Sequence, residues 1–149
     1  MAIRVDVQFA YQDELTPTAA EIKTWVKSTL KDFRKNSELT VRIVDKKEAT
    51  ELNERWRKAT GPTNVLSFPY NDTDGPVPDL LGDIVICAAV VKAEAVRQKK
   101  DLNAHWAHMV VHGTLHLLGF DHVVKRDAEK MEATEISILD RLGFSNPYV

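Results

Sequence analysis

The sequence predicts an α+β fold: a single domain in which a small mixed β-sheet packs on helices, with a histidine-bearing helix near the centre. Two observations favour this class. Segments of alternating apolar residues and segments of helical apolar periodicity both occur, but they do not alternate strictly along the chain. A length of 149 residues is typical of one domain, so we expect residues 1–149 to form one unit.

The N-terminal segment predicts a strand followed by a helix. Residues 2–10 alternate as in a strand with one buried face. Thr16 and Pro17 then predict a helix start, with proline at the first helical position. One apolar stripe follows on this helix: Ile22, Trp25, Val26, Thr29, Leu30 and Phe33.

The middle of the chain predicts strand, helix and strand. Residues 39–44 are apolar enough for a second strand, and residues 47–58 predict a helix. Residues 63–70 predict a third strand, which Pro69 places at the edge or the end of a sheet. Residues 71–79 are rich in proline, glycine and aspartate, and we expect a loop there.

The last third predicts one buried strand and three helices. Residues 81–88 form the strand, and a helix follows to about residue 100. Asp101 or Asn103 can cap the next helix, which should run to Leu118 and stop at Gly119. The last helix, over about residues 126–142, carries an apolar side and ends at Gly143; that side consists of Met131, Ile136, Ile138, Leu139 and Leu142.

Composition limits the classes of function. An apolar fraction of 44% and a charged fraction of 28% are ordinary for a globular protein. The sequence contains no run of apolar residues that reaches the length of roughly 18 residues needed to span a membrane. The N-terminus does not have the pattern of a signal peptide. Cys87 is the single cysteine, which fits a reducing compartment, so we expect a cytoplasmic protein. With a net charge of −2, a polyanion would have to meet a local patch such as Arg55, Arg57 and Lys58.

All five histidines lie between residues 105 and 122, and three belong to the stretch H-G-T-L-H-L-L-G-F-D-H, residues 112–122. On a helix His112 and His116 point from the same face, and Gly119 lets the chain turn back to bring His122 to them. Three imidazoles leave one position of a tetrahedral metal open, as in catalytic zinc sites. The sequence therefore predicts one Zn2+ ion, although imidazoles also suit other divalent transition metals such as Ni2+.

The spacing H-x-x-x-H-x-x-G-x-x-H is also that of the metzincin peptidases, which carry a glutamate base directly after the first histidine. Here that position is Gly113. A glycine cannot transfer a proton, so the metal scaffold is expected without the peptidase base.

Three further polar residues near the motif have two interpretations each. His105 is expected to be exposed or locally hydrogen-bonded, and His108 to lie either behind a metal ligand or toward a substrate. Asp121 could orient an imidazole or cap the turn.

Two more stretches accompany the histidine motif: E-L-N-E-R-W-R-K-A-T-G-P-T-N-V-L-S-F-P at residues 51–69 and L-G-D-I-V-I at residues 81–86. In this order the three motifs resemble the YbeY family of metal-dependent endoribonucleases. The resemblance implies a zincin-like fold and a metal held by His112, His116 and His122. It also implies a functional role for Arg57. The family commonly has aspartate where this chain has Asn64, so no role is assigned to that position.

The resemblance further implies cleavage of single-stranded RNA, with roles in maturation of the 16S rRNA 3′ end and in ribosome quality control. The expected partners are thus ribosomal RNA and the ribosome or its proteins, with no membrane. A metal-activated water or a ribose hydroxyl would attack the phosphodiester, so His116 and Arg57 are the expected catalytic residues. Arg57 would clamp phosphate oxygens, unless it only forms a surface contact with Asn53 or Glu54. Two other functions stay open: a metallopeptidase-like hydrolase, and a non-catalytic module that binds RNA or the ribosome around a structural metal.

Overall fold

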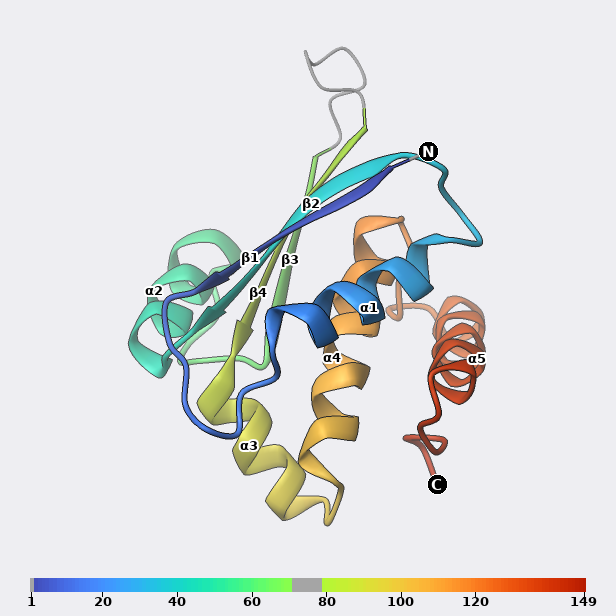
Figure 1. The fold of residues 1–149 in the computed structure, drawn as a ribbon. Coiled ribbons are helices and arrows are strands. Elements are labelled where there is room, and N and C mark those ends of the chain that lie inside the picture. The colour runs from blue at the N-terminus through green and yellow to red at the C-terminus, as the bar shows by residue number, and fades with distance from the viewer. Residues whose placement is uncertain (1, 71–78) are drawn as a thin grey trace.

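The computed structural model describes residues 2–70 and 79–149, and it confirms the α+β class with a four-stranded mixed sheet (Figure 1). The elements in chain order are β1 (Ile3–Phe9), α1 (Ala19–Leu30), β2 (Ser37–Val44), α2 (Lys46–Arg57), β3 (Val65–Pro69), β4 (Leu80–Cys87), α3 (Ala88–Arg97), α4 (Leu102–Leu117) and α5 (Lys125–Arg141). No helix within these residues has the length and apolar character needed to cross a bilayer.

The sheet has the strand order β1-β2-β4-β3. The first three of these strands run parallel, and β3 pairs antiparallel with β4 at the edge. The edge position of β3 that Pro69 predicted is therefore confirmed. Proline fits an edge strand because it cannot donate a ladder hydrogen bond. Strand β4, between two neighbours, is buried as expected, and Cys87 at its end is 1% exposed.

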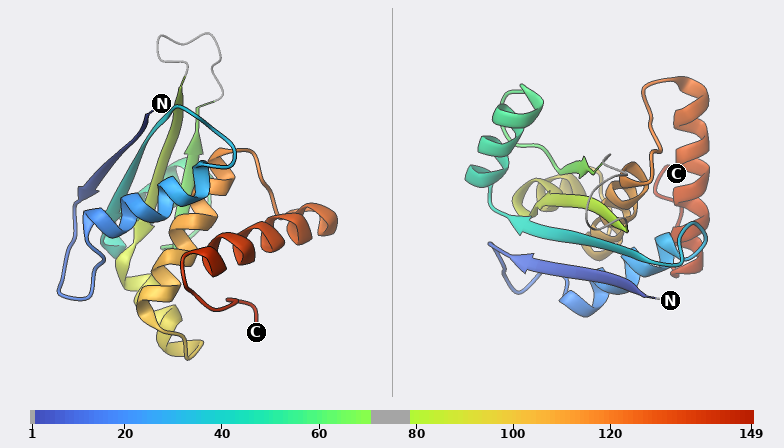
Figure 2. Two further views of the ribbon diagram at one scale, coloured as in Figure 1. Left: turned by 45° about the vertical axis from the view of Figure 1, so that its right-hand side comes forward. Right: turned by 90° about the horizontal axis from the view of Figure 1, so that it is seen from above.

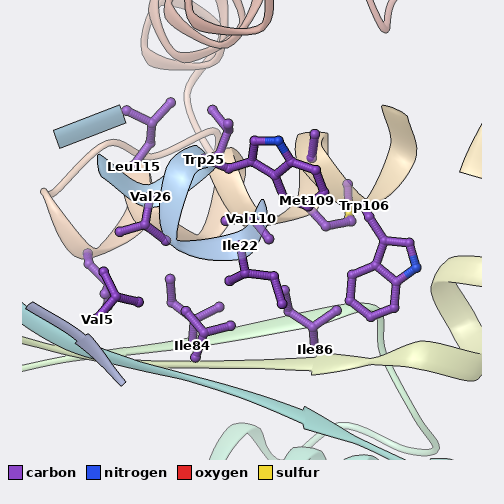
Figure 3. Close-up of a cluster of buried hydrophobic side chains, with 14 of the residues drawn as sticks. Val5, Ile22, Trp25, Val26, Ile84, Ile86, Trp106, Met109, Val110 and Leu115 are labelled. Atoms are coloured by element: carbon purple, nitrogen blue, oxygen red, sulfur yellow. The ribbon is translucent and has the colours of Figure 1, made fainter. Parts of the chain in front are cut away.

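The main core lies between one face of the sheet and helices α1 and α4 (Figures 1 and 3). Side chains of the two helices meet sheet residues such as Val5, Ile84 and Ile86 in this layer (Figure 3). Helix α5 packs on α4, on the side that faces away from the sheet (Figure 1). Helix α4 is thus covered on both sides, which confirms the central position of the histidine-bearing helix.

A smaller apolar cluster lies on the opposite face of the sheet, which α2 covers in part (Figure 2). Because side chains alternate along a strand, β3 serves both layers. Leu66 and Phe68 pack in the small cluster, whereas Val65 and Ser67 approach Gly113 of α4. This edge strand therefore lies between the ends of α2 and α4 that carry the candidate site.

The expected start of the first helix was wrong by two residues. Thr18 is the N-cap, not Thr16, and Pro17 precedes the helix. The Thr18 hydroxyl accepts from the backbone N–H of Glu21, and the Glu21 carboxylate accepts from the backbone N–H of Thr18, both at 3.1 Å. This capping box satisfies two end groups at once and outweighs the preference of proline for the first turn.

Other expected boundaries differ less. Phe33 lies beyond the end of α1, in a turn where its backbone N–H bonds to the carbonyl of Leu30, and so it is not part of the helical stripe. Asp101 caps α4, which settles the choice between Asp101 and Asn103. The expected loop over residues 71–79 falls almost entirely outside the described residues.

Candidate metal centre

Helix α4 brings two histidines together. The Asp101 carboxylate accepts a hydrogen bond from the backbone N–H of Ala104 at 3.0 Å and so fixes the start of the helix. His112 and His116 then project from one face, four residues apart. Their ring centroids are 4.6 Å apart, and their Nε2 atoms are separated by 3.1 Å.

The chain returns to these rings because α4 ends at a glycine turn. Gly119 adopts a φ of 101°, which side-chain-bearing residues rarely take. His122 follows, with its ring centroid 5.4 Å from that of His112 and 4.9 Å from that of His116. The structure thus brings together the three histidines that the motif singled out.

The donor set fits a divalent transition metal. One nitrogen from each of the three rings lies within 4.8 Å of the others. Two nitrogens bound to one tetrahedral zinc at about 2.0–2.1 Å are about 3.3 Å apart, close to the 3.1 Å between His112 and His116. Burial, followed by the neighbouring His112 and His122, lowers the pKa of His116 to about 4. His116 is therefore neutral at pH 7, the form that can donate a lone pair.

The close packing of α4 on the sheet explains why residue 113 is a glycine, and the sequence alone did not reveal this. A Cβ atom at this position would lie 2.9 Å from Cγ2 of Ile84 and 3.1 Å from Cγ2 of Val65. The Gly113 carbonyl also accepts a hydrogen bond from the Ser67 hydroxyl at 3.1 Å. Helix α4 packs so closely on the sheet here that the glutamate base of the metzincin peptidases has no room, which disfavours the peptidase alternative.

The histidines line an open groove of about 650 Å³. The segment around β3 forms one wall, and the segment after α4 forms another. The lining residues are Arg57, Thr63, Asn64, Val65, Leu66, Ser67, Pro69, His112, His116, Gly119, Phe120, Asp121 and His122. The groove therefore combines residues of two separate sequence motifs beside one candidate metal centre.

Arg57 reaches this groove from the last turn of α2. Its guanidinium donates to the backbone carbonyl of Ser67 and lies 5.2 Å from the centroid of the Phe68 ring. Asn53 and Glu54, the two expected surface partners of Arg57, both bond to Gly61 instead. Asn53 donates to the carbonyl of Gly61, and Glu54 accepts from the backbone N–H of Gly61. The structure places Arg57 and the histidines on the same groove.

Of the remaining polar residues, two contact the Glu94 carboxylate and one caps the turn after α4. His105 is buried and not exposed, and its Nε2 lies 2.9 Å from Glu94 Oε1, which agrees with the hydrogen-bonded alternative. Asn64 donates to the same Glu94 carboxylate. Asp121 accepts from the backbone N–H of His122 at 2.7 Å, so it caps the turn.

Sequence reasoning missed Glu135, a fully buried carboxylate of α5 behind the histidines. Its Oε2 atom lies 2.7 Å from His112 Nδ1 and 3.3 Å from His108 Nε2. Burial alone would raise the pKa of Glu135, but hydrogen bonds from His108, His112 and Tyr148 outweigh it and lower the pKa to about 2. A signal was present: this acid sits on the apolar stripe, four residues after Met131.

Comparisons with known proteins agree with the geometry. A family model described as Endoribonuclease YbeY matches residues 8–143. The solution structure of TM1509 from Thermotoga maritima, described as a NESGC target protein, is similar with a TM-score of 0.62 at 25% sequence identity, over 95% of this chain and 92% of that chain. The expected zincin-like domain with its central histidine helix is confirmed. The chain belongs to the endoribonuclease YbeY family, a family of metal-dependent RNA-cleaving enzymes of ribosomal RNA processing.

Proposed function

We propose that this protein is a zinc-dependent, single-strand-specific endoribonuclease. It would act in the cytoplasm, on the 3′ end of 16S rRNA during maturation and in ribosome quality control, with residues 1–149 working as one catalytic domain. The observation that carries the proposal is the shared groove: three imidazole rings, whose nitrogens lie within 4.8 Å of one another, and one guanidinium line the same surface.

The three motif histidines are the proposed ligands. His112 and His116 are held by the buried helix α4, and His122 comes from the exposed segment after it. A zinc ion bound there would supply a Lewis acid and lower the pKa of water to about 7. Among the described residues, the cluster of donor atoms within 4.8 Å of one another in the groove consists of these three histidines, and Cys87, the single cysteine, is buried at the end of β4 outside the groove. Three protein ligands are typical of a catalytic zinc site and four of a structural one.

Arg57 is the proposed phosphate clamp. A guanidinium has five N–H donors, and the hydrogen bond to Ser67 uses only part of them. The ring of Phe68 and the carbonyl of Ser67 hold the group at the groove wall, so little side-chain freedom is lost when a phosphate arrives. Such a clamp stabilises the negative charge that grows on the phosphoryl oxygens during cleavage.

The test compares cleavage of an end-labelled single-stranded RNA by wild type, His116→Ala and Arg57→Ala, purified side by side. Removal of a charge clamp should lower the rate by about 10²-fold or more. Arg4→Ala is the matched control, because Arg4 is exposed on β1, at the opposite edge of the sheet from β3, and does not line the groove. Wild-type and Arg4→Ala proteins should cleave, and a duplex of the same sequence should resist.

Three results would contradict the proposal. Equal cleavage by wild type and His116→Ala would indicate a contaminating ribonuclease. No cleavage by any protein, together with a large fall in melting temperature for His116→Ala, would support a binding module with a structural metal. Casein hydrolysis that disappears in His116→Ala would support the peptidase alternative.

A further inference from the structure

A buried carboxylate stands directly behind one candidate ligand. Glu135 is 0% exposed, and its Oε2 atom lies 2.7 Å from Nδ1 of His112. His108 approaches the same oxygen, with Nε2 at 3.3 Å. The hydroxyl of Tyr148 donates to the other oxygen, Oε1. Both oxygens of one carboxylate are therefore held by named partners.

This contact decides which nitrogen of His112 carries the proton. A carboxylate can only accept, so Nδ1 of His112 must be the N–H donor in this hydrogen bond. A neutral imidazole then has its lone pair on Nε2. That atom is the one that lies 3.1 Å from Nε2 of His116, on the groove side. The lone pair is thus aimed at the place where the three histidines converge.

We propose that Glu135 is a positioning residue: it fixes the orientation and tautomer of His112 so that Nε2 faces the metal, and Tyr148 holds Glu135 in place. This inference rests on the proposed metal centre. The second nitrogen of a ligating histidine commonly donates its hydrogen bond to a carboxylate, and loss of that acceptor typically weakens metal binding by about 10–100-fold.

The surroundings argue against a role in packing alone. The neighbours of Glu135 on the same side of α5 are apolar and buried: Met131, Ile138 and Leu139. A buried charge costs several kcal/mol of solvation, and an apolar residue of similar volume is often as stabilising or more so. A carboxylate at this position is therefore explained by what it does for His112.

Tyr148 extends the arrangement to the end of the chain. Its ring stands edge-on to His108, with centroids 5.4 Å apart, and its hydroxyl lies 3.3 Å from Nε2 of that histidine. Lys100 anchors the same C-terminal segment by donating to the carbonyl of Pro147 at 2.7 Å. The last residues of the chain thus close the side of Glu135 that faces away from His112.

The experiment measures metal binding and not RNA cleavage. Zinc affinity is obtained by competition with a chromophoric chelator, and the absorption spectrum of bound Co2+ reports the ligand geometry. Glu135→Gln keeps the shape and one acceptor oxygen but removes the charge. Glu94→Gln is the matched control, since Glu94 forms a similar contact with a different histidine of α4, His105.

Glu135→Gln should bind zinc about 10-fold or more weakly and shift the Co2+ spectrum, whereas Glu94→Gln should match wild type. Tyr148→Phe should weaken zinc binding by a few-fold, and it replaces the first variant as the test if Glu135→Gln fails to fold. Unchanged affinity and an unchanged spectrum in the folded variants would overturn the positioning role alone. If wild type bound zinc no better than His116→Ala, the metal centre and the proposed function would both be overturned.

Discussion

Gly113 shows how one absent side chain sets both packing and chemistry. An added methyl group would press on branched carbons of Ile84 and Val65, which cannot swing away like the end of a flexible chain. Overpacking of this kind costs typically about 1–3 kcal/mol, whereas alanine gains up to about 1 kcal/mol over glycine in a helix. We therefore predict that Gly113→Ala lowers the free energy of unfolding by about 1 kcal/mol.

Urea denaturation of the metal-free protein measures this change. Glutamate at the same position should destabilise the fold far more and should not create peptidase activity, because its carboxylate would be driven against the sheet. A Gly113→Ala protein more stable than wild type would show that the helix and sheet separate readily, and the steric explanation would be wrong.

The residues of the candidate site differ in how visible they are from the sequence. His112, His116 and His122 lie within eleven residues, so helical geometry for the first two and the glycine turn before the third bring them together. Arg57 could be singled out only by family resemblance, because its place beside the groove depends on how α2 and β3 pack. Glu135 was missed because Glu135 and His112 lie 23 residues apart in the chain and belong to different helices.

At the scale of elements, local signals predicted most of the strands and helices but not their pairing. Alternation and helical periodicity predicted, in the right order, the nine helices and strands of the described residues. The predicted start of α1 was wrong because the prediction rested on Pro17, whereas the capping box of Thr18 and Glu21 fixes the start of the helix. The parallel order of β1, β2 and β4 depends on connections through helices and is not written in any one segment.

The contact between α4 and α5 leads to a prediction on pH. Hydrogen bonds from histidines and Tyr148 lower the pKa of Glu135 from 4.5 to about 2, despite its burial. Between these values the unfolded chain binds more protons than the folded chain, so the stabilising contribution is complete above pH 4.5 and is lost as the pH falls toward 2. We predict that Glu135→Gln, which does not titrate, removes this part of the acid sensitivity.

Urea midpoints of metal-free wild type and Glu135→Gln, taken in a pH series, provide the measurement. The stability advantage of wild type should shrink steadily as the pH drops below 4.5. A constant difference across the series would mean that Glu135 has the same pKa in the folded and unfolded protein, and a difference that grows as the pH drops would mean that Glu135 is protonated in the folded protein.

For the whole molecule, the central helix joins stability to the candidate site. Helix α4 packs on the sheet through one side and on α5 through another, so His112 and His116 are fixed before any metal arrives. His122 is exposed and follows the end of that helix, so its position depends on the segment after Gly119. Metal binding should therefore tie a surface segment to an already rigid core rather than create the fold.

This arrangement predicts the response to zinc. A ligand that binds only the folded state stabilises it by about 2.7 kcal/mol at a free concentration 100 times its Kd. For a domain of this size, about 2–4 °C in melting temperature corresponds to each kcal/mol, so zinc should raise the melting temperature by about 5–10 °C, and a chelator should reverse the shift. His122→Ala should melt at the wild-type temperature without metal, because this side chain is exposed, but zinc should raise its melting temperature far less than that of wild type.

A metal-free wild type that is already unfolded would instead mean that zinc builds the core, and an equal rise in His122→Ala would place the bound metal elsewhere.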